Sequence, residues 1–329
     1  MHPERLSLAL EQGIITLPET GRIAVVAPAL NADLSGLPKD RLDVVTRQAA
    51  VHSAFQNMGY TTLTDIEGPL SAAIVFLPRA KAEARETLAK AAAATDGPLI
   101  VDGQKTDGVD SVLKELRKRA TVGEVYAKAH GKIFAVTQAD LTDWQAVDRP
   151  LVDGRFRTAP GVFSADGIDP ASDHLARALP ENMKGHVVDL GAGWGFLSDA
   201  ILAREGVTSL DLVEADHAAL ACARQNISDP RASFHWDDAL VWRPNTPADH
   251  VVTNPPFHQG RTADPGLGQA FIRAAAAMLA PRGTLWLVAN RHLPYEKTLE
   301  TAFRDVNTLG QTSSFKLYSA TAPRTSRKG

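Results

Sequence analysis

Residues 185–195 have the sequence GHVVDLGAGWG, which indicates the fold of the second half of the chain. The apolar run VVDL has the composition of a buried strand. The glycines after it let the backbone turn tightly and let a ligand approach without a Cβ in its way. FLSDAILARE (196–205) then has the apolar spacing of a helix. A strand, a glycine-rich turn and a helix in this order are typical of a nucleotide-binding site.

The same alternation continues to the end of the chain. Apolar strand-like runs alternate with two helical patterns, HAALACARQNI (217–227) and GQAFIRAAAAMLAPRG (268–283), the second closed by a glycine. The predicted strands lie in VTSLDLVEAD (207–216), ASFHW (232–236), HVVT (250–253) and TLWLVANR (284–291). FKLYSAT (315–321) is expected to add an antiparallel edge strand. Strands that alternate with helices imply parallel crossovers and a doubly wound sheet.

The first half repeats this pattern. Strands are predicted in GRIAVVAPAL (21–30), LDVVT (42–46), SAAIVFLP (71–78) and GPLIVDG (97–103), with helices at 49–60, 81–94 and 109–120. GEVYAKAHGKIFAV (123–136) is expected to close the half as a hairpin with its turn near Ala-His-Gly. The predicted fold class is therefore α/β, with two Rossmann-like domains in tandem, 1–150 and 151–329, as a duplication would give.

The glycine turn favours S-adenosylmethionine over NAD as its ligand. Its spacing is GxGxG rather than the GxGxxG of dinucleotide sites, and Asp189 stands two positions before the first glycine. A carboxylate there would repel a pyrophosphate but attract a cationic amino-acid group. The predicted cofactor site therefore includes Asp189, Gly191, Ala192, Gly193, Trp194 and Gly195. Trp194 has two open roles: packing over the methionine part of the cofactor, or covering the core.

Two acidic positions follow at the ends of the next strands. Glu214 lies about twenty residues past the glycines, where a carboxylate can accept both ribose hydroxyls of an adenosine. Asp238, in WDDAL, is placed to accept from the adenine amino group, with Asp237 as a competitor for that role.

Asn254-Pro255-Pro256-Phe257 is the most specific motif in the chain, and it directly follows the predicted strand HVVT. Open α/β folds bind ligands at the carboxyl edge of the sheet. The prolines stiffen the turn and remove two N–H donors, so that carbonyl oxygens dominate. An amide and the Pro255 carbonyl can accept both hydrogens of a planar amino group, and Phe257 can stack on a base. These four residues are the predicted catalytic site, and Asn254 also borders the cofactor.

Composition excludes several other classes of protein. The 329 residues include one cysteine, Cys222, which rules out a disulfide framework and a four-thiolate zinc site. Cys222 lies on the apolar face of its helix and is expected in the core, so it is not a nucleophile.

No metal is expected, because transfer from a sulfonium depends mainly on positioning. No apolar run is long enough to span a membrane, and the first residues lack a signal-peptide core, so a cytoplasmic protein is expected.

The motifs together resemble those of class I S-adenosylmethionine-dependent methyltransferases that modify amino nitrogens. More closely, the second half resembles the bacterial ribosomal RNA guanine-N2 methyltransferases of the RsmC/RlmG type. The resemblance lies in VVDLGAGWG, the acid in LDLVEAD, NPPFH, VANRHLPYEKTLE and the final FKLY. APGVFSADGIDPASDHL (159–175) resembles the segment before the glycine turn in that family, and Phe163 within it is assigned to the cofactor site. The resemblance covers residues 155–320 and implies methylation of N2 of a guanine, with small-subunit (16S) ribosomal RNA expected.

The resemblance also implies that the first half is a degenerate methyltransferase copy used for RNA recognition and support. Its first strand runs into APALNADLSG without a glycine turn, and its fourth ends in FLPR where the second half has NPPF. The net charge of −3 is not that of a basic nucleic-acid module, so the ribosomal RNA or small subunit would be held by local clusters. These are KELRKR (114–119), which can equally be a solvated helix face, and the tail PRTSRKG (323–329).

Other functions remain open at this stage. NPP[FY] also serves enzymes that methylate adenine N6 or a protein glutamine amide, although the duplicated first half favours the guanine-N2 family. A catalytically silent RNA-binding or ribosome-assembly factor is a further alternative, which the intact second-half motifs oppose. The protein is expected to be a monomer.

Overall fold

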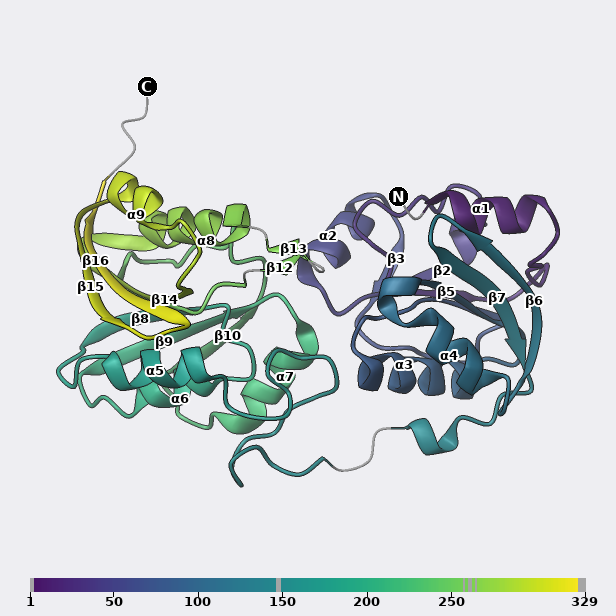
Figure 1. Ribbon diagram of the computed structural model, residues 1–329, viewed down its shortest axis with the longest axis horizontal. Helices are drawn as coiled ribbons and strands as arrows, with labels where there is room; N and C mark the ends of the chain where they lie inside the picture. Colours follow the sequence, from purple (N-terminus) through teal and green to yellow (C-terminus); the bar gives the residue numbers. More distant parts are fainter. Residues whose placement is uncertain (1–2, 146–148, 257, 260–261, 264, 325–329) are drawn as a thin grey trace. The chain divides into compact units, whose positions relative to one another are not determined.

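A computed structural model describes residues 3–145, 149–256, 258–259, 262–263 and 265–324 of the chain (Figure 1). The chain divides into two compact units, Met1–Arg149 and Pro150–Gly329. The described part of each unit contains one seven-stranded sheet with helices on both faces.

The first unit has the strand order β3-β2-β1-β4-β5-β7-β6. Its strands are β1 (Ile23–Val26), β2 (Leu42–Val45), β3 (Thr61–Leu63), β4 (Ala72–Phe76), β5 (Leu99–Gln104), β6 (Thr121–Lys128) and β7 (Gly131–Thr137). The helices are α1 (Pro3–Glu11), α2 (Ala49–Asn57), α3 (Lys81–Ala94) and α4 (Val109–Leu116), with short 3-10 turns at Lys39–Arg41, Lys105–Asp107 and Thr142–Trp144. Helices α1 and α2 pack on one face of the sheet, and α3 and α4 pack on the other.

The predicted hairpin at the end of the first unit is confirmed. Strands β6 and β7 pair antiparallel, and the turn between them consists of Ala129 and His130, which both have positive φ values, 50° and 57°. Two successive left-handed residues make the tight turn that suits the twist of paired strands.

The second unit has the matching order β10-β9-β8-β11-β14-β16-β15. Its sheet contains β8 (Gly185–Leu190), β9 (Val207–Glu214), β10 (Ala232–Trp236), β11 (Ala248–Thr253), β14 (Leu279–Asn290), β15 (Phe303–Gln311) and β16 (Phe315–Pro323), and a separate small pair is formed by β12 (His258–Gln259) and β13 (Thr262–Ala263). The helices are α5 (Pro170–Ala178), α6 (Phe196–Leu202), α7 (His217–Asn226), α8 (Pro265–Met278) and α9 (Glu296–Ala302). The predicted tandem Rossmann-like architecture is confirmed.

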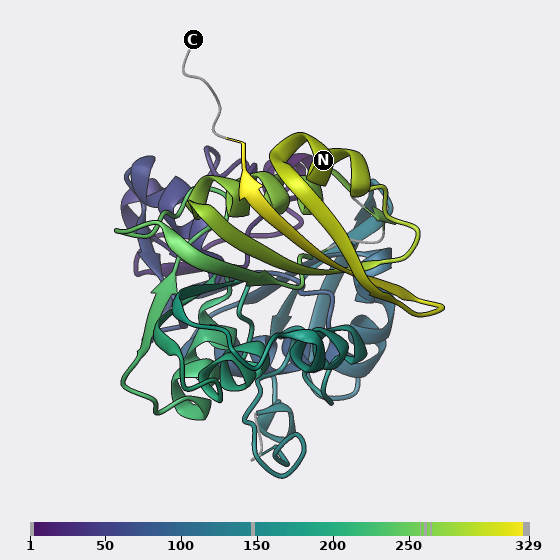
Figure 2. The same cartoon turned by 90° about the vertical axis from the view of Figure 1, so that its left-hand side faces the viewer.

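Two apolar layers hold this second sheet. Helices α8 and α9 bury Phe271, Ile272 and Leu299 on one face, while α5, α6 and α7 bury side chains such as Leu175 and Ile201 on the other. Figure 2 looks onto this unit and shows the sheet between the two helical layers. The central strands are therefore inaccessible on both faces, and only the strand ends are free to form a site.

Two expectations about the last third of the chain are wrong. FKLYSAT lies in β16, which is antiparallel to β14 as expected, but it is not the edge, because β15 pairs with its other side. The helix expected over 268–283 ends at Met278, and Leu279 already belongs to β14. Pro281 cannot donate a helical hydrogen bond, and a Cβ on Gly283 would lie 2.9 Å from the Ala248 carbonyl oxygen, so this segment packs as a strand end.

The first unit lacks the parts that make the second a ligand site. Within residues 27–41 the only helical piece after β1 is the turn Lys39–Arg41, and Leu34 and Leu37 are buried in the core there. Ala27 leaves β1 with φ 54°, as Gly191 leaves β8 with φ 80°. The first unit therefore has a similar turn of the backbone after its first strand, but apolar side chains occupy the space beyond it.

No helix in the described ranges is long and apolar enough to cross a membrane.

A polar cluster connects three strands of the second sheet. The Asp211 carboxylate on β9 lies 2.8 Å from His186 Nε2 on β8 and 2.8 Å from His235 Nε2 on β10. Burial opposes ionisation, but the hydrogen bonds from both rings hold the pKa of Asp211 below its usual range, and the Asp211 bond raises the pKa of His186.

Replacing Asp211 by Asn should destabilise the protein in a pH-dependent way. A lowered carboxylate pKa stabilises the fold above about pH 4, and a raised histidine pKa stabilises it below about pH 6.5. We expect Asp211→Asn to lower the free energy of unfolding by about 1–3 kcal/mol at pH 5.5 and by clearly less at pH 8.5. Urea unfolding at both pH values measures this, with the exposed Asp305→Asn as control. An equal loss at both pH values would contradict the charged cluster.

Candidate cofactor and acceptor site

The glycine turn after β8 forms one wall of the site. Gly191, Gly193 and Gly195 have φ values of 80°, 57° and 94°, which side-chain-bearing residues rarely adopt. A Cβ on Gly193 would meet no atom within 4 Å, so it would project into open space. A Cβ on Gly195 would lie 3.2 Å from Ile227 Cγ1, against the end of α7. The turn therefore leaves room for a ligand at Gly193 and packs closely at Gly195.

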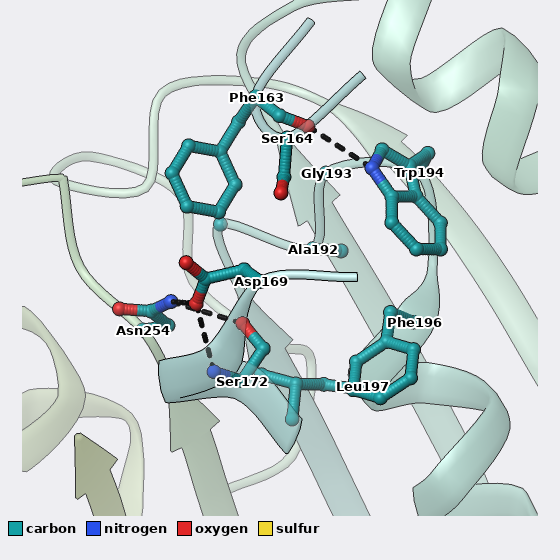
Figure 3. A pocket seen from close by; sticks show the side chains of 11 residues that line it. Phe163, Ser164, Asp169, Ser172, Ala192, Gly193, Trp194, Phe196, Leu197 and Asn254 are labelled. Atoms are coloured by element: carbon teal, nitrogen blue, oxygen red, sulfur yellow. Dashed lines mark hydrogen bonds between the residues drawn. The ribbon is translucent and has the colours of Figure 1, made fainter. Parts of the chain in front are cut away.

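A pocket opens beside this turn, and it brings together residues from three parts of the second unit (Figure 3). The segment before α5, the glycine turn with the start of α6, and the end of β11 all contribute. The lining residues are Phe163, Ser164, Asp169, Ser172, Gly191, Ala192, Gly193, Trp194, Phe196, Leu197 and Asn254. The pocket thus brings together six of the predicted site residues: Phe163, Gly191, Ala192, Gly193, Trp194 and Asn254.

Asp189 lies beneath the turn rather than in the pocket. Its side chain is fully buried, and Oδ2 accepts a hydrogen bond of 2.6 Å from Ser198 Oγ on α6. Burial raises its pKa to about 7, with the Ser198 bond opposing this and the nearby Glu214 charge adding to it. Oδ1 is buried and has no hydrogen-bond partner among the residues that the structure describes. The structure therefore gives Asp189 no direct exposure to a ligand, and its visible role is to join β8 to the first turn of α6.

Glu214 connects the glycine turn to the start of α7. Its Oε2 accepts from the Gly193 backbone N–H at 2.8 Å, and Oε1 accepts from that of Asp216 at 2.8 Å. Burial raises the pKa of this carboxyl, and the two backbone N–H groups oppose the shift. Glu214 does not line the pocket but borders the next stretch of the sheet edge, beside Gly193.

Asp237 and Asp238 shape the turn after β10. The Asp237 backbone N–H donates to the Glu214 carbonyl oxygen at 3.2 Å, so the turn lies next to Glu214. Asp237 Oδ1 accepts from the Asp238 N–H at 2.7 Å, and Asp238 Oδ1 accepts from the Leu240 N–H at 2.9 Å. Neither residue lines the pocket.

Trp194 packs in an aromatic cluster that also forms the pocket wall. The indole is 4% exposed and lies 5.1 Å from the Phe156 ring and 5.9 Å from the Phe196 ring, measured between centroids. Its Nε1 donates to the Phe163 carbonyl oxygen at 3.0 Å (Figure 3). Of the two roles expected for Trp194, the structure shows the covering of the core directly. Cys222 is buried in the same cluster, as predicted.

Asn226, at the end of α7, holds the segment before α5 against the glycine turn. Its Oδ1 accepts from the Arg157 N–H at 2.7 Å, while Nδ2 donates to the Arg157 and Trp194 carbonyl oxygens at 2.9 and 2.8 Å. One side chain thus binds both backbone groups of Arg157 and fixes the approach of the chain to Phe163.

Asn254 stands where β11 ends, at the carboxyl edge of the sheet. Thr253 Oγ1, fully buried, donates to the Leu190 carbonyl oxygen at 2.7 Å and so ties this strand end to the start of the glycine turn. Asn254 Nδ2 donates to Asp169 Oδ2 and to Ser172 Oγ, both at 2.9 Å. Pro255 is buried and Pro256 is exposed, whereas the prediction for Phe257 lies outside the described residues.

Asp169 and Ser172 were not predicted as site residues. Asp169 is the N-cap of α5 and accepts from the Ser172 N–H at 2.8 Å, with Pro170 in the first turn. An Asp before Pro at a helix start is a recognisable capping signal, but its contact with Asn254 spans 85 residues and has no trace in local sequence. Among the described residues, no group of three or more His, Cys, Asp or Glu side chains could hold a metal ion.

Residues 153–319 match the family model described as Methyltransferase small domain. The chain is 31% identical over 268 residues to Ribosomal RNA small subunit methyltransferase C of Serratia proteamaculans, covering 78% of this chain and 76% of that protein. It is 30% identical over 322 residues to the protein of the same name from Pseudomonas paraeruginosa, covering 90% and 95%.

The fold is also similar to a solved structure, "T. Thermophilus 16S rRNA N2 G1207 methyltransferase (RsmC) in complex with AdoMet and Guanosine", with a TM-score of 0.75. The match has 28% identity and covers 96% of this chain and 91% of that chain. Fold and site together define an S-adenosylmethionine-dependent methyltransferase. More narrowly, the chain belongs to the ribosomal RNA small subunit methyltransferase C family, which confirms the predicted resemblance.

Loosening the Asn226 contacts should weaken cofactor binding. Without them the segment that carries Phe163 loses its attachment to the glycine turn, so part of the binding energy would be needed to order it. We expect Asn226→Ala to raise the dissociation constant of S-adenosylmethionine by about 3–10-fold, measured by calorimetry. Asn226→Asp should lose at least as much, because its second carboxylate oxygen would face the Arg157 and Trp194 carbonyl oxygens and repel them. Unchanged affinity in Asn226→Ala would show that the segment is ordered by other contacts.

Proposed function

We propose that this protein transfers a methyl group from S-adenosylmethionine to the exocyclic N2 amine of a guanine in 16S ribosomal RNA. The observation that carries the proposal is the Asn254 amide at the carboxyl edge of the sheet, with its nitrogen engaged by Asp169 and Ser172 beside the glycine turn. The names of the relatives, and the AdoMet and guanosine bound in the similar solved structure, support the same cofactor and substrate.

The cofactor would lie along the edge formed by the ends of β8, β9 and β10. Gly193 would let the cofactor approach the backbone of the turn, with Gly191 and Gly195 giving the turn its shape, and Glu214 would accept from the ribose hydroxyls. Asp238, whose Oδ1 accepts from Leu240, would keep Oδ2 for the adenine amine. Phe163, Ala192 and Trp194 would border the methionine part, with Asp189 supporting the turn from below. When bound, S-adenosylmethionine supplies an electrophilic methyl group on a sulfonium.

The residues after β11 would hold the methyl acceptor. Asn254 Oδ1 and the Pro255 carbonyl oxygen would each accept one hydrogen of the guanine amine, which keeps the nitrogen in place and favours its pyramidal form. Phe257 would stack on the base, a contact worth about 1–3 kcal/mol by alanine substitution. Because the amine lies on a base edge, the guanine must be unpaired or flipped out of its helix. Positioning of the two reacting atoms would then account for most of the catalysis, without a metal.

The two units would divide the work. Residues 151–329 would form the catalytic domain, and residues 1–150 would support it and contact the RNA or the small ribosomal subunit. Candidates for phosphate contacts are the exposed side chains of Lys114, Arg117 and Lys118, at the end of α4 and just after it. The tail beyond the described residues is a further candidate. We further propose a monomer that acts in the cytoplasm, where ribosomal RNA is modified.

Methyl incorporation tests the proposal directly. The protein is incubated with labelled S-adenosylmethionine and with 16S RNA or small subunits that lack modifications, and the RNA is digested to nucleosides. Label in N2-methylguanosine is the expected result. Label in N6-methyladenosine would keep the enzyme class and overturn the substrate, and label only in protein would point to a glutamine amide.

Asn254→Ala should abolish turnover while sparing the cofactor. The variant removes the acceptor for the amine but no contact to the glycine turn, so we expect kcat to fall by about 100-fold or more. The dissociation constant of S-adenosylmethionine should change by less than about twofold. Steady-state kinetics and calorimetry measure the two effects, with exposed Asn307→Ala on β15 as control. A joint loss of turnover, affinity and thermal stability would mean that Asn254 is structural.

A further inference from the structure

The start of α5 holds the donor end of the Asn254 amide. Asp169 Oδ2 and Ser172 Oγ each lie 2.9 Å from Asn254 Nδ2, so both hydrogens of the amide nitrogen are engaged within the protein. Ser172 is 7% exposed, and Asp169 Oδ2 also accepts from the Ser172 N–H at 2.8 Å. The contact is therefore part of a compact network rather than a chance surface approach.

This network selects one of the two orientations of the amide. A hydroxyl such as that of Ser172 can accept from an amide nitrogen or donate to an amide oxygen, so it would tolerate either orientation. A carboxylate oxygen accepts only, and it would repel an amide oxygen placed at the same distance. Asp169 thus requires Nδ2 on its side, and Oδ1 is turned the other way, as Figure 3 shows.

The orientation decides what the site can bind. An outward-facing oxygen accepts from an amino group, whereas a flipped amide would present its own N–H groups to the hydrogens of the substrate. When Asn254 Oδ1 accepts a hydrogen of the substrate amine, the lone pair of the amine nitrogen stays free to point at the methyl donor. Without the lock, the side chain could also rotate away from the end of β11, because an unfixed side chain has several rotamers.

We propose that Asp169 and Ser172 are positioning residues that lock the Asn254 amide in its acceptor orientation. The inference rests on the proposed role of Asn254 as the group that accepts from the substrate amine. Asp169 acts through Asn254 here and not as a base or a cofactor ligand. Its second task, capping α5 through the Ser172 N–H, is chemically separable from the lock.

Three substitutions separate the lock from the cap. Asp169→Ser keeps an N-cap of equal quality, but the shorter side chain cannot reach Asn254. Asp169→Asn keeps the cap and offers a neutral amide oxygen to both Asn254 Nδ2 and the Ser172 N–H. Ser172→Ala removes the second acceptor and leaves Asp169 in place.

We expect kcat to fall in the variants that lose a hydrogen bond to Asn254 Nδ2, and not in the variant that loses only the charge of Asp169. Asp169→Ser should lower kcat by about 10–100-fold, because a misplaced reactive group costs on this scale. Asp169→Asn should stay within about threefold of the wild type, and Ser172→Ala should lose about 3–10-fold. The dissociation constant of S-adenosylmethionine and the melting temperature should be nearly unchanged in all three.

A second readout needs no substrate. In ¹⁵N-labelled protein the Asn254 Nδ2 signals are identified by their absence from Asn254→Ala. We expect these signals to be shifted by strong hydrogen bonding in the wild type and in Asp169→Asn, and to move toward free-amide values in Asp169→Ser. This readout tests the lock even if the wild type yields no N2-methylguanosine, a result that would count against the proposed function alone.

Several results would overturn the inference. Wild-type kcat in Asp169→Ser would show that the amide needs no lock. An equal loss in Asp169→Asn and Asp169→Ser would show that Asp169 acts by its charge, and a matching loss of S-adenosylmethionine affinity would make it a cofactor ligand. Unchanged Asn254 signals in Asp169→Ser would show that the hydrogen bond does not hold the amide in solution.

Discussion

The hydrogen bond from Thr253 Oγ1 to the Leu190 carbonyl oxygen joins the two strand ends on which the whole site depends. Strands β8 and β11 are parallel neighbours, so the glycine turn and Asn254 leave the sheet at the same edge. Both strands are buried on both faces by helical layers, which fixes their register and prevents them from sliding. A methyl donor at the glycine turn and an acceptor at Asn254, as proposed, would therefore be held at a distance set by the rigid sheet.

Around this edge, side-chain hydrogen bonds hold the glycine turn and the segment before α5 in place. Asp189 joins the strand to α6 from below, Glu214 binds the Gly193 N–H, and Asn226 fastens the segment that carries Phe163. Asp169 ends that same segment and contacts Asn254, so one stretch of chain reaches both halves of the pocket. The segment before α5 thus connects the glycine turn to the end of β11.

The first unit shows what the same topology does without these parts. Its strand order matches that of the second unit, yet Leu34 and Leu37 fill the region beyond β1, and β4 is followed by Leu77 rather than an amide. The sheet and its two layers persist because their apolar patterning is sufficient to form them. A binding edge requires specific residues at the strand ends, and the fold does not depend on them.

The architecture and the positions of the two main motifs could be predicted from local patterns, because strand, glycine turn and helix follow one another along the chain and NPPF comes directly after an apolar run. The predictions of the edge strand and of the end of α8 were wrong. FKLYSAT carries no sign that β15 pairs with its outer side. The burial of Asp189 beneath the turn, the packing of Trp194 in an aromatic cluster and the contact of Asp169 with Asn254 became visible in the folded chain alone. Contacts between residues 85 positions apart arise from packing, and no local pattern encodes them.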